Sequence, residues 1–166
     1  TTTQLGGTRL PDRRFLGYLL KNTASLHGTV SRGVCKVKDG KLDTIQEALK
    51  VQLYPDGHLT DLDTDTDLAP DTVVSMNFWG FMPSIFPALR TYFENFLRGL
   101  PDDAVKAECL LPLMVGEELK AGRMTVSVLH SKDLWFGMTY REDRGRVAED
   151  LRRLHESGVY PPSLRD

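Results

Sequence analysis

Residues 75–81 (SMNFWGF) contain the most distinctive group of side chains that could bind a ligand. The Asn77 amide provides a hydrogen-bond donor and an acceptor, and the Trp79 ring close to it provides an aromatic wall. Sugar hydroxyls are recognised by such combinations. The alternative is that Phe78, Trp79 and Phe81 belong to the hydrophobic core and that Asn77 caps a nearby helix. The sequence leaves both interpretations open.

Three other residues have types suited to a ligand that carries hydroxyls and a phosphate. Gly33 lies at the mouth of an expected strand, where the missing Cβ lets a ligand approach the backbone closely. Glu47 lies near the end of another expected strand, and its carboxylate can accept hydrogen bonds from vicinal hydroxyls while the Lys50 ammonium contacts a phosphate. The alternative is an exposed Glu47–Lys50 charge pair without a ligand.

The common self-contained catalytic motifs are absent from the sequence. It has no GxxxxGK[ST], GxGxxG, GxSxG or HExxH pattern, and its 4 histidines fall in different expected elements. The acidic run at residues 61–67 (DLDTDTD) fails as a calcium loop, because Thr66 replaces the turn glycine and Thr72 replaces the terminal glutamate. We therefore interpret it as a solvated acidic loop, and no metal ligands are identified.

Periodicity and turn signals predict alternating strands and helices. Strands are expected over residues 15–20, 33–37, 42–49, 51–54, 58–62, 73–81, 124–129 and 134–138. Helices are expected from Pro83 to Gly99, from Asp102 to Gly122 with a break or kink at Pro112, and from a capping box at residues 139–142 to near Gly158. This pattern favours an α/β layer fold with a mixed sheet flanked by helices.

Composition narrows the class of protein. The chain has 166 residues and a net charge of -2 without a Lys/Arg cluster, which excludes nucleic acid as a partner. Cys35 and Cys109 have neither metal-site nor disulfide spacing, so we expect free thiols in the cytoplasm. Apolar stretches end well before the roughly 18 residues that a membrane span needs. We expect a loop or truncated start over residues 1–14 and one unit over residues 15–166.

Four stretches together carry a resemblance to a known family. They are residues 20–37 (LKNTASLHGTVSRGVCKV), 74–86 (VSMNFWGFMPSIF), 106–115 (KAECLLPLMV) and 134–147 (LWFGMTYREDRGRV). In sequence, order and spacing they resemble a bacterial group of sugar-phosphate nucleotidyltransferase-like proteins, relatives of the glucose-1-phosphate uridylyl- and thymidylyltransferases. The resemblance implies a Rossmann-like α/β domain, of which this chain is the C-terminal, acceptor-substrate-binding half.

The resemblance also implies a reaction and a set of binding residues. The family joins a nucleoside triphosphate to a sugar 1-phosphate or similar phosphorylated acceptor with Mg²⁺ and releases pyrophosphate. The implied substrate-binding residues are Gly33, Glu47, Lys50, Asn77, Glu108 and Trp135. Relatives carry Lys directly after the glutamate, where this chain has Ala48, and an Asp shortly after the tryptophan, where it has Phe136 and Gly137. No Mg²⁺ ligand is therefore found.

The expected partners follow from the same resemblance. They are a sugar phosphate with a nucleoside triphosphate, or a nucleotide-sugar. The triphosphate-binding motif is missing, so the chain alone is expected to bind and not to catalyse. The alternative is a non-catalytic sugar-phosphate binding or regulatory module. A half-domain would leave an apolar surface built partly from residues 15–20 (FLGYLL), which predicts self-association or a missing N-terminal half.

Overall fold

The structure is a computed structural model that describes residues 13–137, 141–161 and 163. Its centre is a sheet of seven strands. The strands are β1 (Arg13–Leu19), β2 (Val30–Lys38), β3 (Lys41–Leu53), β4 (Leu59–Asp61), β5 (Thr66–Asp67), β6 (Val73–Phe81) and β7 (Ser127–His130). The helices are the short 3₁₀ turns η1 (Leu20–Asn22) and η2 (Pro83–Ile85) and the α-helices α1 (Phe86–Arg98), α2 (Leu111–Lys120) and α3 (Asp143–Glu156).

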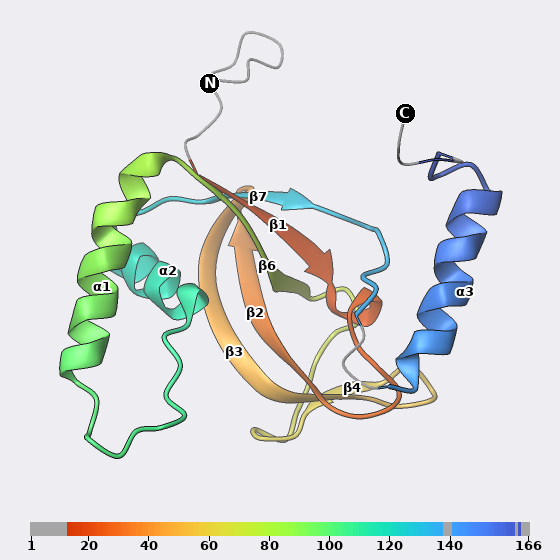
Figure 1. The fold of residues 1–166 in the computed structure, drawn as a ribbon, viewed down its shortest axis with the longest axis horizontal. Helices are drawn as coiled ribbons and strands as arrows, with labels where there is room; N and C mark the ends of the chain where they lie inside the picture. The colour runs from red at the N-terminus through yellow and green to blue at the C-terminus, as the bar shows by residue number, and fades with distance from the viewer. Residues whose placement is uncertain (1–12, 138–140, 162, 164–166) are drawn as a thin grey trace, which may run out of the picture.

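The sheet closes on itself. Its strand order is β2-β6-β1-β7-β3-β4-β5. Strand β2 also pairs with β3, so the five strands from β2 to β3 in this order form a closed barrel (Figure 1). Only β1 and β7 run parallel; the other pairs are antiparallel. The expected Rossmann-like α/β fold is therefore wrong. Strands β2 to β5 follow one another through short turns, and such hairpins produce antiparallel pairs instead of the parallel pairs that helical crossovers join.

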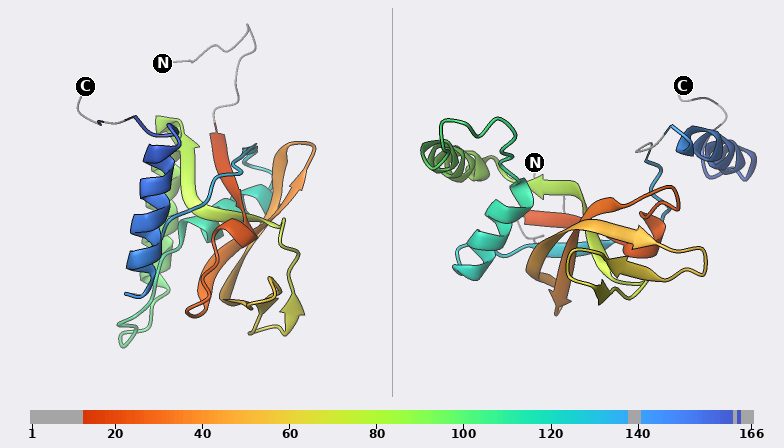
Figure 2. Two further views of the ribbon diagram at one scale, coloured as in Figure 1. Left: turned by 90° about the vertical axis from the view of Figure 1, so that its right-hand side faces the viewer. Right: turned by 90° about the horizontal axis from the view of Figure 1, so that it is seen from below.

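The helices do not cover both faces of a sheet. In Figures 1 and 2, α1 and α2 lie on one side of the barrel and α3 stands on the opposite side. The α2 helix packs on β3 where Gly116 leaves room for Ile45, since a Cβ there would lie 3.4 Å from the Ile45 Cγ2 atom. No helix in the described part of the chain is long and apolar enough to cross a membrane.

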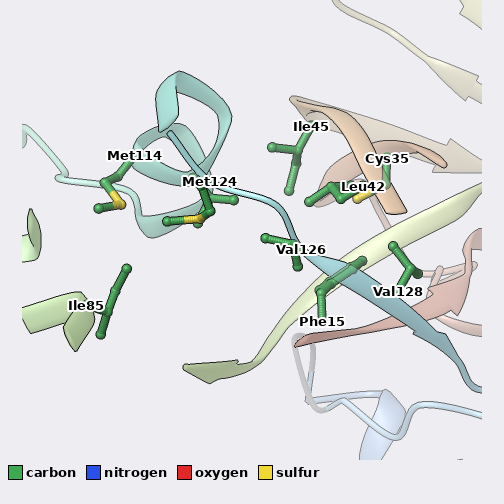
Figure 3. Close-up of a cluster of buried hydrophobic side chains, with 10 residues drawn as sticks. Phe15, Cys35, Leu42, Ile45, Ile85, Met114, Met124, Val126 and Val128 are labelled. Carbon is green, nitrogen blue, oxygen red and sulfur yellow. The ribbon is translucent and has the colours of Figure 1, made fainter. Parts of the chain in front are cut away.

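The core forms on the two faces of the sheet. One cluster lies inside the barrel and under α2, with Phe15, Cys35, Ile45, Met114 and Val126 among its members (Figure 3). The second cluster lies on the other face and consists of Leu20, Val30, Ala48, Val51, Leu59 and Val74. Strand β1 has a neighbour on each side, and Phe15 and Leu20 are both 0% exposed. The expected exposed surface around residues 15–20 is therefore wrong.

Several element boundaries also differ from the expectation. Arg13 and Arg14 belong to β1, while the rest of the expected N-terminal loop lies outside the described residues. Residues 134–137 form no strand, and the helix expected from Asp102 begins only at Leu111. Pro112 occupies its first turn, where a missing N–H costs nothing, so it does not kink the helix. The capping box at residues 139–142 lies partly outside the described residues, and α3 begins at Asp143.

Candidate functional site

A polar pocket of about 240 Å³ lies between strands β2, β3 and β6 and the segment that leads into α2. It brings together four of the six residues that the sequence indicated: Gly33, Glu47, Asn77 and Glu108. The other lining residues are Ser31, Leu49, Ser75, Leu110 and Pro112. Gly33, Glu47 and Asn77 come from three separate strands, and their convergence depends on the closed sheet. The pocket is framed by the barrel and α2, so it is not the expected crevice at the ends of parallel strands.

Gly33 allows its two neighbouring strands to bring side chains close together. It is paired with Glu47 on β3 and with Ser75 on β6. A Cβ at Gly33 would lie 3.1 Å from the Ser75 Cβ and 3.2 Å from the Glu47 Oε1 atom. The absent side chain therefore makes room for the Glu47 carboxylate beside Ser75.

A bulge in β6 places Asn77 at the pocket. Gly17 pairs with Ser75 and Phe15 with Trp79, so three residues of β6 stand opposite one residue of β1. Asn77 adopts a left-handed φ of 56°, which asparagine tolerates better than most residues. Its backbone N–H donates to the Ser75 Oγ at 3.1 Å. The bulge turns Asn77 out of the ladder toward the pocket.

The Asn77 amide is oriented by its neighbours. The Trp79 Nε1–H donates to the Asn77 Oδ1 at 3.3 Å, so the amide N–H₂ group remains as the donor for a ligand. Trp79 also packs against Phe15, with ring centroids 4.5 Å apart, and stacks on Phe81. These two rings therefore contribute to the core, as the alternative interpretation held. Phe78 is 63% exposed, however, and Asn77 caps no helix.

The Glu47 carboxylate is partly shielded from water and forms no salt bridge with a described residue. Burial raises the pKa of the Glu47 carboxyl above its ordinary value. No lysine or arginine is among the described residues that line the pocket, and Glu108 adds a second carboxylate to it. The pocket therefore offers hydrogen-bond acceptors in excess of donors, which suits a ligand rich in hydroxyl groups.

Lys50 lies elsewhere. Arg32 pairs with Ala48 and Val30 with Val51, so β3 has a bulge that carries Lys50. Its Nζ atom contacts the Asp63 Oδ1 at 2.7 Å in the acidic hairpin, which consists of β4, β5 and the turn between them. Lys50 therefore does not line the pocket that contains Glu47 and Asn77, and the charge pair considered as its alternative role joins Lys50 to Asp63 instead of to Glu47.

Trp135 also lies outside the pocket. Its ring is 5.3 Å from the buried guanidinium of Arg32, and its backbone N–H donates to the Asn22 carbonyl at 3.0 Å. Arg32 donates to the Thr23 Oγ1 and to the Thr23 and Ser31 carbonyls, and burial lowers its pKa to about 10. Trp135 thus stacks on a structural arginine, a pairing that no local sequence pattern indicated.

Two polar pocket residues, Ser31 and Ser75, were missed by sequence reasoning. Ser31 lies two positions before the predicted Gly33 on β2, and the two-residue period of a strand points such neighbours to one face. Ser75 lies two positions before Asn77, but the bulge in β6 interrupts the period there. That spacing was the available signal. It indicates which side chains share a face but not which face lines a pocket.

The implied Mg²⁺ does not fit the described residues. They contain no group of three or more His, Cys, Asp or Glu side chains placed to hold a metal ion. The Asp61 side chain of the acidic hairpin accepts hydrogen bonds from the Asp63 N–H and the Thr64 hydroxyl, and Asp63 is paired with Lys50.

Comparison with known proteins adds no assignment. No protein-family model matches the chain, and no curated protein matches its sequence.

Proposed function

We propose that this pocket binds the sugar ring of a phosphorylated acceptor, as the acceptor-binding part of a nucleotidyltransferase. The convergence of Glu47, Ser75 and Asn77 around the side-chain-free Gly33 is the observation that supports this proposal. The intact enzyme would join a nucleoside triphosphate to a sugar 1-phosphate or similar acceptor and release pyrophosphate. That reaction rests on the sequence resemblance, whereas recognition of the ring rests on the pocket.

Each polar side chain has a distinct part in ring recognition. The Glu47 carboxylate accepts hydrogen bonds from two vicinal hydroxyls, and the Asn77 N–H₂ donates to a hydroxyl or ring oxygen. A pocket of about 240 Å³ suits a single sugar ring better than a nucleotide, since sites for drug-sized ligands are roughly 300–1,000 Å³. Because no lysine or arginine of the described residues lines the pocket, the phosphate of the ligand is expected to point to its open side.

One sequence observation favours a second candidate, the non-catalytic binding module. Phe136 stands close to Trp135 where relatives carry an acidic metal ligand. Both candidates use the same pocket. Pyrophosphate release from a nucleoside triphosphate in the presence of glucose 1-phosphate by a longer form of the protein would distinguish the enzyme from the module.

A titration of the chain with glucose and with glucose 1-phosphate tests ring recognition. Glu47→Gln keeps the shape of the side chain but removes the charge, so both ligands should bind about tenfold more weakly. Asp43→Asn is the matched control, because Asp43 is an exposed carboxylate on the same strand outside the pocket. We expect no change in affinity for that variant.

Because Glu47 contacts the ring, Glu47→Gln should lose the same affinity for glucose as for glucose 1-phosphate. Failure of both ligands to bind, or equal losses in Glu47→Gln and Asp43→Asn, would refute the assignment.

A further inference from the structure

A second cavity, of about 490 Å³, lies between the segment that follows β7 and the C-terminal end of α3. Four aromatic side chains line it: Tyr18, Trp135, Phe136 and Tyr160. Asp133 is the only charged residue of its lining within the described chain. The cavity shares no lining residue with the pocket that contains Glu47, so it is a separate site.

The wall that carries Trp135 is held in place from behind. The Asn22 Nδ2 donates to the Lys132 carbonyl at 3.0 Å, and the Trp135 N–H donates to the Asn22 carbonyl at the same distance. The buried guanidinium of Arg32 lies over the Trp135 ring. These contacts orient Trp135 before any ligand arrives, which lowers the entropic cost of binding.

The opposite wall is fixed by the end of α3. Gly158 has a left-handed φ of 74°, and the Val159 and Tyr160 N–H groups both donate to the Leu154 carbonyl, at 3.0 and 3.2 Å. The His155 ring meets the Tyr160 ring edge to face, with centroids 5.5 Å apart. Tyr160 is thereby held at the cavity although it lies beyond the helix.

Asp133 presents an oriented acceptor at this cavity. The Ser131 hydroxyl donates to the Asp133 Oδ2 at 2.7 Å, and the Asp133 N–H donates to the Ser131 Oγ at 3.1 Å. Ser131 is only 8% exposed, so it anchors the carboxylate from the protein side. The Oδ1 atom of Asp133 accepts no hydrogen bond from a described residue.

From these four observations we infer that the cavity binds a planar aromatic ring with an amino group on its edge, such as adenine. The ring stacks among the aromatic side chains, and its N–H₂ donates to the Asp133 carboxylate. An alkyl chain fits less well because it offers no hydrogen-bond donor to this carboxylate.

The test compares adenine with purine, which has the same rings but lacks the amino group. The chain has 2 tryptophans, and their indole N–H signals are separate in a ¹⁵N-edited NMR spectrum. One signal reports on Trp135 at this cavity, and the other reports on Trp79, which contacts Asn77 at the pocket that contains Glu47. Adenine should shift the Trp135 signal and leave that of Trp79 in place. It should bind about tenfold more tightly than purine, because a hydrogen bond to a charged group is lost in purine.

Two variants and a control assign the contacts. Asp133→Ala removes the acceptor for the amine, so adenine should bind no better than purine. Tyr160→Ala should weaken both ligands severalfold, whereas Tyr54→Ala, a similarly exposed tyrosine outside the cavity, should change neither. Equal affinities for adenine and purine, no shift of the Trp135 signal, or undiminished binding by Tyr160→Ala would each overturn the inference.

Discussion

Replacing Gly33 with alanine tests whether the candidate pocket depends on the close approach of two strands. The new Cβ would lie 3.1 Å from the Ser75 Cβ, 3.2 Å from the Glu47 Oε1 and 3.2 Å from the Ile45 Cδ1. The Ser75 Cβ can move only with its strand, whereas the other two atoms are ends of flexible side chains. The structure therefore predicts moderate overpacking and a displaced Glu47 carboxylate.

The expected change in the free energy of unfolding of Gly33→Ala is the difference between two opposing effects. Overpacking of a filled site costs about 1–3 kcal/mol, and the adjustable Glu47 and Ile45 side chains place Gly33→Ala in the lower half of that range. Loss of glycine from the unfolded chain returns about 0.4–1 kcal/mol. We expect a net loss of about 1 kcal/mol in the free energy of unfolding, which lowers Tm by about 2–4 °C in a chain of this size.

Urea and thermal unfolding measure this change, and Gly145→Ala is the control. A Cβ at Gly145, inside α3, meets no atom within 4 Å, so alanine there should stabilise the protein by about 0.5–1 kcal/mol. The two glycine replacements should thus have opposite signs. If Gly33→Ala were as stabilising as Gly145→Ala, the close approach of the strands would be refuted.

A double mutant identifies the contact responsible. Ile45→Val removes the Cδ1 atom that a Cβ at Gly33 would meet, so Gly33→Ala should cost less in that background than in the wild type. A coupling of at least about 0.5 kcal/mol is expected for residues in contact. Additive effects would show that Ile45 does not take up the strain. Glucose affinity should fall in Gly33→Ala even where Ile45→Val restores stability, because the Glu47 carboxylate remains displaced.

Three further predictions concern the barrel and its ionisable groups. Gly17→Ala should destabilise the fold by about 3 kcal/mol or more in urea unfolding, because its Cβ would lie 2.5 Å from the Val73 Cγ1; a loss below that of Gly33→Ala would contradict the packing of β1. Cys35 is buried, and burial and the nearby Glu47 raise its pKa to about 12. At pH 8 a thiol reagent should therefore modify Cys35 about a thousandfold more slowly in the folded than in the unfolded chain, as measured by mass spectrometry. Fast labelling of native Cys35 would contradict its burial. Burial raises the Glu47 pKa on folding, so the stability that its protonated form contributes is present below its unfolded pKa and is lost as the pH rises through the folded value. The free energy of unfolding of Glu47→Gln relative to wild type should therefore increase from pH 4 to pH 7. The opposite trend in urea midpoints would exclude a raised pKa.

Local sequence patterns identified most strands and the turns between them. Asp39 and Gly40 have φ values of 51° and 72°, as expected for the two-residue turn that joins β2 and β3. The hairpin from β3 to β4 and the strand at residues 73–81 were also predicted and are confirmed. These features depend on residues a few positions apart, whose backbone preferences and alternation are visible in the sequence.

The fold class was not visible in those patterns. Closure of the barrel requires β2 to pair with both β3 and β6, and the hydrophobic pattern of a strand does not state its neighbours. Strand composition suggested an α/β layer fold because strands and helices alternate in the second half of the chain. The described structure instead has β1 between β6 and β7 inside one closed sheet.

The residues of the candidate site could also be predicted only in part from the sequence. Residue type made Gly33, Glu47 and Asn77 candidate binding residues, because a missing Cβ, a carboxylate and an amide each have recognisable chemistry, and the family resemblance grouped them with Lys50 and Trp135. Only the tertiary structure separated them from Lys50 and Trp135. Lys50 sits on a bulge and pairs with Asp63, and Trp135 stacks on a buried arginine from another strand. Bulges and long-range contacts depend on strand register, which is decided by how the whole chain packs.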